Sequence, residues 1–316
     1  MSAEPNYALI FGASGVAGWR LVNELLQNYP KEGTFSKVTA VVNRALKFED
    51  TYWPSPSYKQ ENDQATEVAA NLGMLSRVIG ALNIFSPNLE FLIFPSRPKG
   101  YGIQIDPSDR PFTASFMETM VLPPHLSAEN WYASFQSYLT TAIANRSWTW
   151  AEVRPDAIIG FVPNGSTFNP AAHWATYLSA YALIEGPGSK VPYPGTTAGY
   201  ESLFNDASAS IIGRLTIYVC LHPETCGGGK LFNIADQEQP TIMKERWPNI
   251  CEYFGLVGVG PLGEGKGALL PGEYLQANKE KLEEKRLKGV DVWKGDFLDT
   301  YGFYCDFDRQ LGLKKN

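Results

Sequence analysis

The sequence lacks the features that mark several classes of protein. Its 27 Lys and Arg residues are scattered and outnumbered by 33 Asp and Glu residues, so no basic cluster indicates a nucleic-acid-binding face. Four cysteines without a Cys-x-x-Cys pair favour reduced, structural thiols. The three histidines lack the spacing of metal ligands. We therefore expect a protein that binds neither nucleic acid nor a metal.

Long hydrophobic runs are missing as well. No apolar stretch reaches the length of a membrane span, and residues 1–5 lack the charged and apolar regions of a signal peptide. These absences predict a cytoplasmic protein without a membrane span. The chain has 316 residues, 44% of them hydrophobic, and a net charge of −6. It is long enough for one large α/β domain, or for a nucleotide-binding domain with a smaller appended region.

A glycine-rich motif near the N-terminus is the most informative feature that is present. It follows the apolar run 8–11 and precedes the amphipathic run 19–26, which predicts a strand, a tight turn and a helix. Glycines let the backbone approach a pyrophosphate, and the N-terminus of the helix offers free N–H groups. The candidate cofactor-binding residues in this motif are Gly12, Ser14, Gly15, Val16, Ala17 and Gly18.

The end of the second expected strand, 37–42, indicates which dinucleotide binds. Asn43 and Arg44 follow it directly, at the position that faces the adenosine ribose in a Rossmann unit. No acidic residue stands there to accept from the 2′-hydroxyl of NAD, whereas an arginine can pair with the 2′-phosphate of NADP. The alternative is a solvated loop arginine. We predict NADP(H).

Strands and helices alternate through the first half of the chain. This order predicts a Rossmann-type, doubly wound parallel sheet that binds its ligand at the carboxyl ends of the strands. Residues 1–165, completed by 200–235, are the expected NADP-binding domain, and 166–316 mainly form a region that covers the substrate. Further expected elements are strands at 88–94, 148–153 and 232–234, and helices at 16–28, 67–82, 131–145, 170–185, 206–221 and 242–254.

Three details of the second half are also predicted. Asn169 is the expected N-cap of one helix, with Pro170 at the first helical position, and Asp206 is expected to cap the following helix. The Gly- and Pro-rich stretch 255–272 is expected to be a surface excursion.

The expected catalytic pair departs from the usual spacing. Short-chain dehydrogenases use a helical tyrosine with a lysine one turn later, but the chain has no Tyr-x-x-x-Lys, and Gln136 stands where the lysine would follow Tyr132. Lys99 lies at the end of the strand before the tyrosine helix and could reach the same point in space. A preorganised hydroxyl donor supported by a cation suits a reaction that builds negative charge on a carbonyl oxygen.

Several blocks resemble the progesterone 5β-reductase/iridoid synthase-like (PRISE) family of short-chain dehydrogenases, in its fungal branch. The glycine motif matches that family. So do the blocks at 96–101, 130–132, 148–161, 247–255 and 306–311.

The resemblance implies NADPH-dependent 1,4-reduction of enones or enals, with Tyr132 binding the substrate carbonyl and Lys99 as the cation beside it. It also implies that Ser96, Lys99, Tyr132, Pro155 and Ile158 contact the cofactor. The residues assigned to the substrate pocket are Tyr101, Trp131, Phe161, Phe168, His173 and Tyr177.

The chain also departs from this family. Residues 58–63 pass directly into the helix at 67–82, so about one βα unit, on the order of 30 residues, is missing, and the chain stops short of the family's usual last helix. A true loss would leave a gap in the parallel sheet and weaken cofactor binding. Ala133 replaces a second tyrosine of the family motif, which leaves the identity of the substrate open.

Three functions follow. The leading one is an NADPH-dependent reductase of an activated C=C bond or a carbonyl in an apolar small molecule, in secondary metabolism. The others are a non-redox cyclase or isomerase on the same scaffold and a protein that binds NADP(H) without turnover. The sequence does not fix the oligomeric state, for which a homodimer is one candidate.

Overall fold

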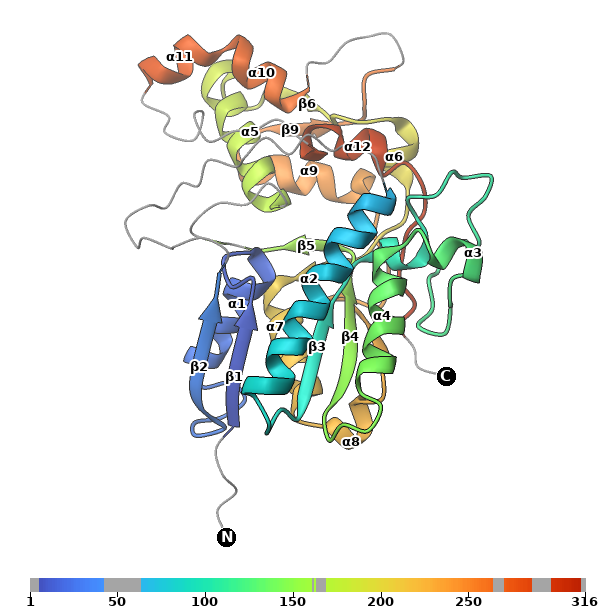
Figure 1. The fold of residues 1–316 in the computed structure, drawn as a ribbon. Helices are drawn as coiled ribbons and strands as arrows, with labels where there is room; N and C mark the ends of the chain where they lie inside the picture. The colour runs from blue at the N-terminus through green and yellow to red at the C-terminus, as the bar shows by residue number, and fades with distance from the viewer. Residues whose placement is uncertain are drawn as a thin grey trace.

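The computed structural model describes residues 6–42, 64–160, 162, 169–263, 270–285 and 297–313. Figure 1 shows an α/β part at the bottom and a mainly helical part at the top. The α/β part contains the strands β1 (Asn6–Phe11), β2 (Phe35–Val41), β3 (Phe91–Pro95), β4 (Thr149–Pro155) and β8 (Lys230–Ile234). Its helices are α1 (Val16–Leu26), α2 (Gln64–Phe85), α4 (Trp131–Ala142), α7 (Ala209–Cys220) and α8 (Pro223–Cys226).

The remaining elements lie above the carboxyl ends of these strands or connect the two parts (Figure 1). The short connecting elements are the 3-10 turn η1 (Pro98–Tyr101), α3 (Pro124–Ser127), β5 (Ala157–Ile159) and β7 (Asp206–Ser208). The upper part contains α5 (Pro170–Glu185), β6 (Lys190–Pro192), α6 (Thr197–Glu201), α9 (Met243–Tyr253), β9 (Val257–Val259), α10 (Pro271–Ala277), α11 (Lys279–Glu284), η3 (Phe297–Thr300) and α12 (Tyr301–Tyr304).

Every ladder between these strands is parallel, which confirms the predicted fold class. β4 pairs with β3 on one side and with β8 on the other. Six of its seven residues are buried, as expected for a parallel strand that helices cover on both faces. In the order β3–β4–β8 and in the separate pair β5–β7, strands that are far apart in the sequence lie side by side.

The sheet is interrupted between β1 and β3. Among the described residues, β1 pairs only with β2, and β3 pairs only with β4. Alternate side chains of β1 are exposed: Tyr7 by 71%, Leu9 by 46% and Phe11 by 51%. Since successive residues of a strand face opposite sides, one face of the β1–β2 pair lacks a covering layer within the described chain. The break lies where the sequence analysis expects a missing βα unit.

Helix α2 corrects one expectation from the sequence. Its window Val68–Phe85 has a mean hydropathy of 1.4 and is long and apolar enough, by length and composition, to cross a membrane. Only 11% of this window is buried inside the structure, and its buried residues Ile79 and Leu82 pack in a cluster with Phe135 and Leu139 of α4. The helix therefore packs against α4 as one layer over the sheet.

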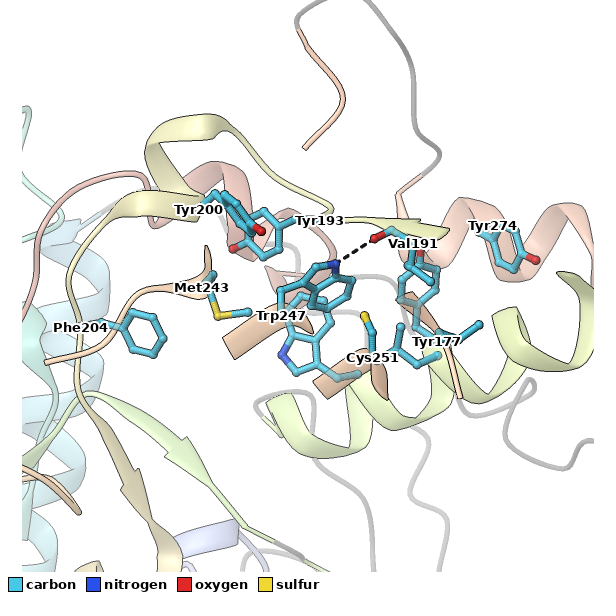
Figure 2. Packing of buried hydrophobic residues seen from close by; sticks show 12 residues of the cluster. Tyr177, Val191, Tyr193, Tyr200, Phe204, Met243, Trp247, Cys251 and Tyr274 are labelled. Carbon is cyan, nitrogen blue, oxygen red and sulfur yellow. Dashed lines mark hydrogen bonds between the residues drawn. The ribbon is translucent and has the colours of Figure 1, made fainter. Parts of the chain in front are cut away.

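The upper part has its own aromatic core, shown in Figure 2. Trp247 of α9 is fully buried, and its indole N–H donates to the carbonyl oxygen of Val191 in β6 at 3.0 Å. The rings of Trp174 from α5 and Tyr193 lie 5.2 and 5.6 Å from the Trp247 ring. This core fixes α5 and α9 next to β6.

The helix ends agree with one prediction and correct another. Asn169 caps α5 as expected, because its side chain accepts from the backbone N–H of Ala172 at 3.2 Å. Asp206 does not cap α7, because it belongs to β7 and pairs with Ala157. Ser208 takes that role and accepts from the backbone N–H of Ile211 at 3.2 Å. The expected surface excursion at 255–272 contains strand β9, which pairs with β6.

Candidate functional site

The glycine motif forms a tight turn at the carboxyl end of β1. Gly12 has a φ of +72°, and its N–H donates to the carbonyl oxygen of Val41 in β2 at 2.9 Å. A Cβ at Gly18 would overlap the backbone of Gly12, so only glycine allows α1 to lie this close to the turn. Gly15 precedes α1 without a side-chain cap, which leaves the first N–H groups of the helix for an anionic ligand.

The other residues of the motif anchor this turn. Val16 packs with Val162 and Ala209, and Ala17 lies against the core between α7 and the sheet. Ile158 of β5 contacts the same two clusters, so β5 packs directly against the start of α1. Of the remaining cofactor predictions, Asn43 and Arg44 lie outside the described residues, as do the pocket candidates Phe161 and Phe168.

Asn130 joins the backbones of the two candidate catalytic residues. It is 3% exposed, and its side-chain oxygen accepts from the backbone N–H groups of Tyr132 and Ala133 at 3.0 and 3.3 Å. Its side-chain nitrogen donates to the carbonyl oxygen of Lys99 at 2.6 Å. One amide therefore caps the tyrosine helix and holds the turn that carries Lys99. The sequence places Asn130 in the motif before Tyr132 but does not indicate this role.

Aromatic packing fixes the ring of Tyr132. Tyr132 is 5% exposed, and the centroid of its ring lies 3.7 Å from that of Trp131 and 5.9 Å from that of Phe94. Trp131, a pocket candidate, is partly buried in the same cluster. Tyr132 is therefore held at the start of α4 by packing as well as by the Asn130 cap.

A buried polar network lies against the turn that carries Lys99. The carboxylate of Glu152 accepts from Ser96, Gln136 and Arg154, and the Arg154 Nη2–Oε1 distance is 2.5 Å. Gln136, at the position of the usual lysine, thus points into a buried ion pair. The guanidinium of Arg154 packs on Gly100, where a Cβ would overlap it. Ser96 lies inside this network.

Tyr101 lies beside the same arginine. It is 1% exposed, its ring stacks on Phe116 at 5.2 Å, and its hydroxyl donates to Oδ1 of Asn233 at 2.7 Å. Burial raises the pKa of Tyr101 to about 12, so the hydroxyl stays protonated and keeps this bond. Tyr101 is the last residue of η1, and these contacts anchor that end of the turn.

The two remaining pocket candidates come from α5. His173 is 8% exposed and its Nε2 lies 3.6 Å from Oδ1 of Asp299. Burial lowers the pKa of His173 to about 3. Tyr177 is 4% exposed and belongs to the upper aromatic core.

A cavity of about 250 Å³ lies between the two parts of the molecule. Its wall is mostly apolar, with one acidic and one basic side chain. The lining residues are Ala157, Ile159, Pro170, Ala171, Trp174, Ala175, Phe204, Asp206, Met243, Arg246, Ile250, Phe254 and Tyr301. None of the described pocket candidates is among them. Sequence reasoning missed this cavity because its residues come from distant segments with no shared motif.

Comparison with known proteins agrees with this architecture. The family model of the PRISE-like Rossmann-fold domain matches residues 8–58 and 56–292. The chain belongs to this family. The resemblance drawn from the sequence blocks is thereby confirmed, and the two matches meet at 56–58 in the sequence, between the segments of β2 and α2.

Curated relatives include fungal short chain dehydrogenases. AusT of Aspergillus calidoustus is 27% identical over 294 residues, which cover 79% of this chain and 71% of ausT. SirR of Leptosphaeria maculans is 25% identical and covers 97% of this chain and 85% of sirR. That alignment runs over 356 positions, more than the 316 residues of the chain, so it contains gaps in this chain. A 3-oxo-Delta(4,5)-steroid 5-beta-reductase of Arabidopsis thaliana is 26% identical over 83% of this chain and 66% of its own length.

Solved structures share the fold. A GDP-mannoheptose C4 reductase from Campylobacter jejuni with NADP bound has a TM-score of 0.54 and 14% identity, covering 84% of this chain and 92% of its own. A Thermus thermophilus UDP-glucose 4-epimerase in complex with NAD has a TM-score of 0.53 and 16% identity, covering 95% and 98%. At such identities the likeness establishes a Rossmann fold.

Proposed function

We propose that the chain is an NADPH-dependent reductase of an activated C=C bond or a carbonyl in an apolar small molecule of secondary metabolism. The observation that carries the proposal is the Asn130 side chain, which joins the Lys99 turn to the helix of Tyr132. Supporting it, the relatives are named short chain dehydrogenases and a steroid 5β-reductase.

The glycine turn fits a dinucleotide. A Cβ at Gly18 would fill the space between α1 and the turn, and α1 begins without a side-chain cap. Gly12, Ser14, Gly15, Val16, Ala17 and Gly18 would hold the pyrophosphate, with Asn43 and Arg44 at the ribose and Ser96, Pro155 and Ile158 toward the nicotinamide. When bound, NADPH supplies the hydride.

In this mechanism the hydroxyl of Tyr132 donates a hydrogen bond to the substrate carbonyl. The Lys99 ammonium stabilises the negative charge that grows on that oxygen during reduction. The fixed ring of Tyr132 means that the donor needs no reorientation during the reaction.

The predicted pocket residues remain Tyr101, Trp131, Phe161, Phe168, His173 and Tyr177. The two-domain division at 165, a cytoplasmic location and a homodimer also remain predictions.

The first experiment is a titration of NADPH and NADH into the purified chain, with the heat of binding measured by calorimetry. We expect micromolar NADPH binding with a clear preference over NADH. A panel of enones and enals, assayed by loss of NADPH absorbance, then tests turnover. Tyr132→Phe and Lys99→Met should lower kcat by about 10²–10⁴-fold, the usual size of a lost acid–base contribution.

Tyr138→Phe, on the same helix, is the matched control and should stay within twofold. Unchanged turnover in Tyr132→Phe would refute the mechanism.

A second candidate function is binding of NADP(H) without turnover. The interruption between β1 and β3 favours it. Tight NADPH binding with no activity on the whole panel would select it.

A further inference from the structure

The cavity between the two parts of the molecule lies across β5 from the glycine turn. Ile158 packs toward Val16 of α1, whereas its neighbours Ala157 and Ile159 line the cavity. This alternation follows from the two-residue period of a strand. β5 thus separates the cavity from the predicted cofactor turn.

Helices of the upper part supply most of the apolar wall. Trp174 and Ala175 come from α5, and Met243 and Ile250 come from α9. Trp174 also contacts the ring of the buried Trp247, so the wall is anchored in the upper core. A preformed apolar wall of this kind suits a hydrophobic small molecule.

One corner of the cavity is polar. The side chain of Asp206 is 8% exposed and pairs with Nη1 of Arg246, whose side chain is 36% exposed. The Arg246 guanidinium also lies 5.9 Å from the ring of Phe204. Within the described ranges, its other N–H groups make no hydrogen bond, so the arginine has donors left for a ligand.

The surroundings of this corner favour a neutral ligand. Asp156 pairs with Arg309 at 3.0 Å and also lies near Arg97, and Asp236 accepts from Ser208 at 2.7 Å. Three carboxylates and three guanidinium groups therefore lie around this corner, with no charge in excess among them. An anion would have to leave water for a mostly apolar wall, whereas a neutral acceptor oxygen needs only one N–H donor.

We propose that this cavity binds a neutral, largely apolar small molecule whose single acceptor oxygen takes a hydrogen bond from Arg246. This site is independent of the proposed reductase chemistry. It requires no cofactor and none of the groups at Tyr132 or Lys99.

Calorimetry on the full chain without cofactor tests the proposal with three compounds that share one ring system. These are 2-acetylnaphthalene, 2-ethylnaphthalene and 2-naphthoate, which carry a neutral acceptor, no acceptor and an anion. We expect the ketone to bind at least fivefold more tightly than the hydrocarbon and the anion to bind most weakly. Arg246→Gln should remove the advantage of the ketone. Arg214→Gln, which alters an exposed arginine on α7, should preserve it.

Two further variants locate the site and separate it from catalysis. Ala175→Leu adds carbon atoms to the cavity wall and should abolish binding of all three compounds, with thermal midpoints checked for each variant. Tyr132→Phe should bind the ketone like the wild type even where turnover is lost. Equal binding of ketone and hydrocarbon, tightest binding of the naphthoate, absence of binding, or an unaffected Arg246→Gln variant would each overturn the proposal.

Discussion

At the residue scale, Asn130 couples helix capping to the geometry of the proposed site. Replacement by aspartate keeps a good N-cap acceptor but puts a carboxylate oxygen against the carbonyl of Lys99, where an N–H donor now lies. We expect Asn130→Asp to lower kcat at least tenfold and to shift its pH profile, with little change in NADPH affinity. Steady-state kinetics across pH checks this.

Asn169→Asp is the control, because Asn169 caps α5 without a second partner on a catalytic turn. It should leave kcat within twofold. A kcat of Asn130→Asp equal to the wild-type value would mean that the amide serves only as a cap.

Gly100 leaves room for the guanidinium of Arg154, which packs against it. A methyl group there would overlap the guanidinium of Arg154, which cannot move away without weakening the ion pair with Glu152. We expect Gly100→Ala to destabilise the protein by about 2–4 kcal/mol, as overpacking combined with a disturbed buried pair does.

Urea unfolding measures this effect. Gly80→Ala in α2 is the matched control, because nothing lies within 4 Å of its Cβ position. There the alanine should be neutral or stabilising by about 0.5–1 kcal/mol, since it favours the helix. Equal stabilities for the two variants would contradict this interpretation of Gly100.

At the scale of the element, hydrophobic periodicity predicted most helices and strands. The cap at Asn169 with Pro170 was also predictable, because it depends on local backbone chemistry. Asp206 was misassigned because its side chain pairs with Arg246 from a helix about 40 residues away, which no local pattern reveals.

The site divides in the same way. The glycine turn follows from spacing, and its close packing is present in the structure. The partners of Glu152 come from the residue after β3, from α4 and from β4, so their meeting depends on tertiary packing. The cavity likewise could not be predicted, because β5, α5 and α9 meet only in the folded chain.

Helix α5 carries a pH-dependent term in stability. The pKa of His173 falls to about 3 in the folded state from an ordinary 6.5, so the unfolded chain binds one more proton between these values. This contribution is present above pH 6.5 and is lost as the pH falls toward 3. The slope approaches about 1.4 kcal/mol per pH unit.

We expect the wild type to lose more unfolding free energy than His173→Gln between pH 6.5 and 4. Urea unfolding at a series of pH values measures the difference. Replacement of the exposed His125 by glutamine is the control and should follow the wild type. Parallel curves for wild type and His173→Gln would show that the buried imidazole accepts its proton without cost.

At the scale of the whole molecule, the interrupted sheet divides the α/β part into two pieces. β4 is buried along almost its whole length, whereas β1 exposes every second side chain. Local opening is easier where fewer apolar contacts must break. We expect amides of β1 and β2 to exchange with deuterium at least tenfold faster than those of β4 and β8.

Hydrogen exchange followed by mass spectrometry resolves these segments. α7 lies behind both pieces and packs against α1, so its protection should fall between the two. Uniform protection across β1, β2, β4 and β8 would mean that the two pieces unfold as one cooperative unit. The interruption itself was expected from the family resemblance, but its effect on pairing needed the structure.

The interruption has a further consequence for how the protein behaves in solution. Among the described residues, β1 and β3 each have one side without a paired strand, and Leu9 and Phe11 stand exposed beside it. Such an edge is a template on which a strand of another chain can add, the first step of aggregation. Natural proteins protect edges of this kind with lysine or proline. Solubility, rather than folding, is therefore the property that a charged residue at position 9 would improve.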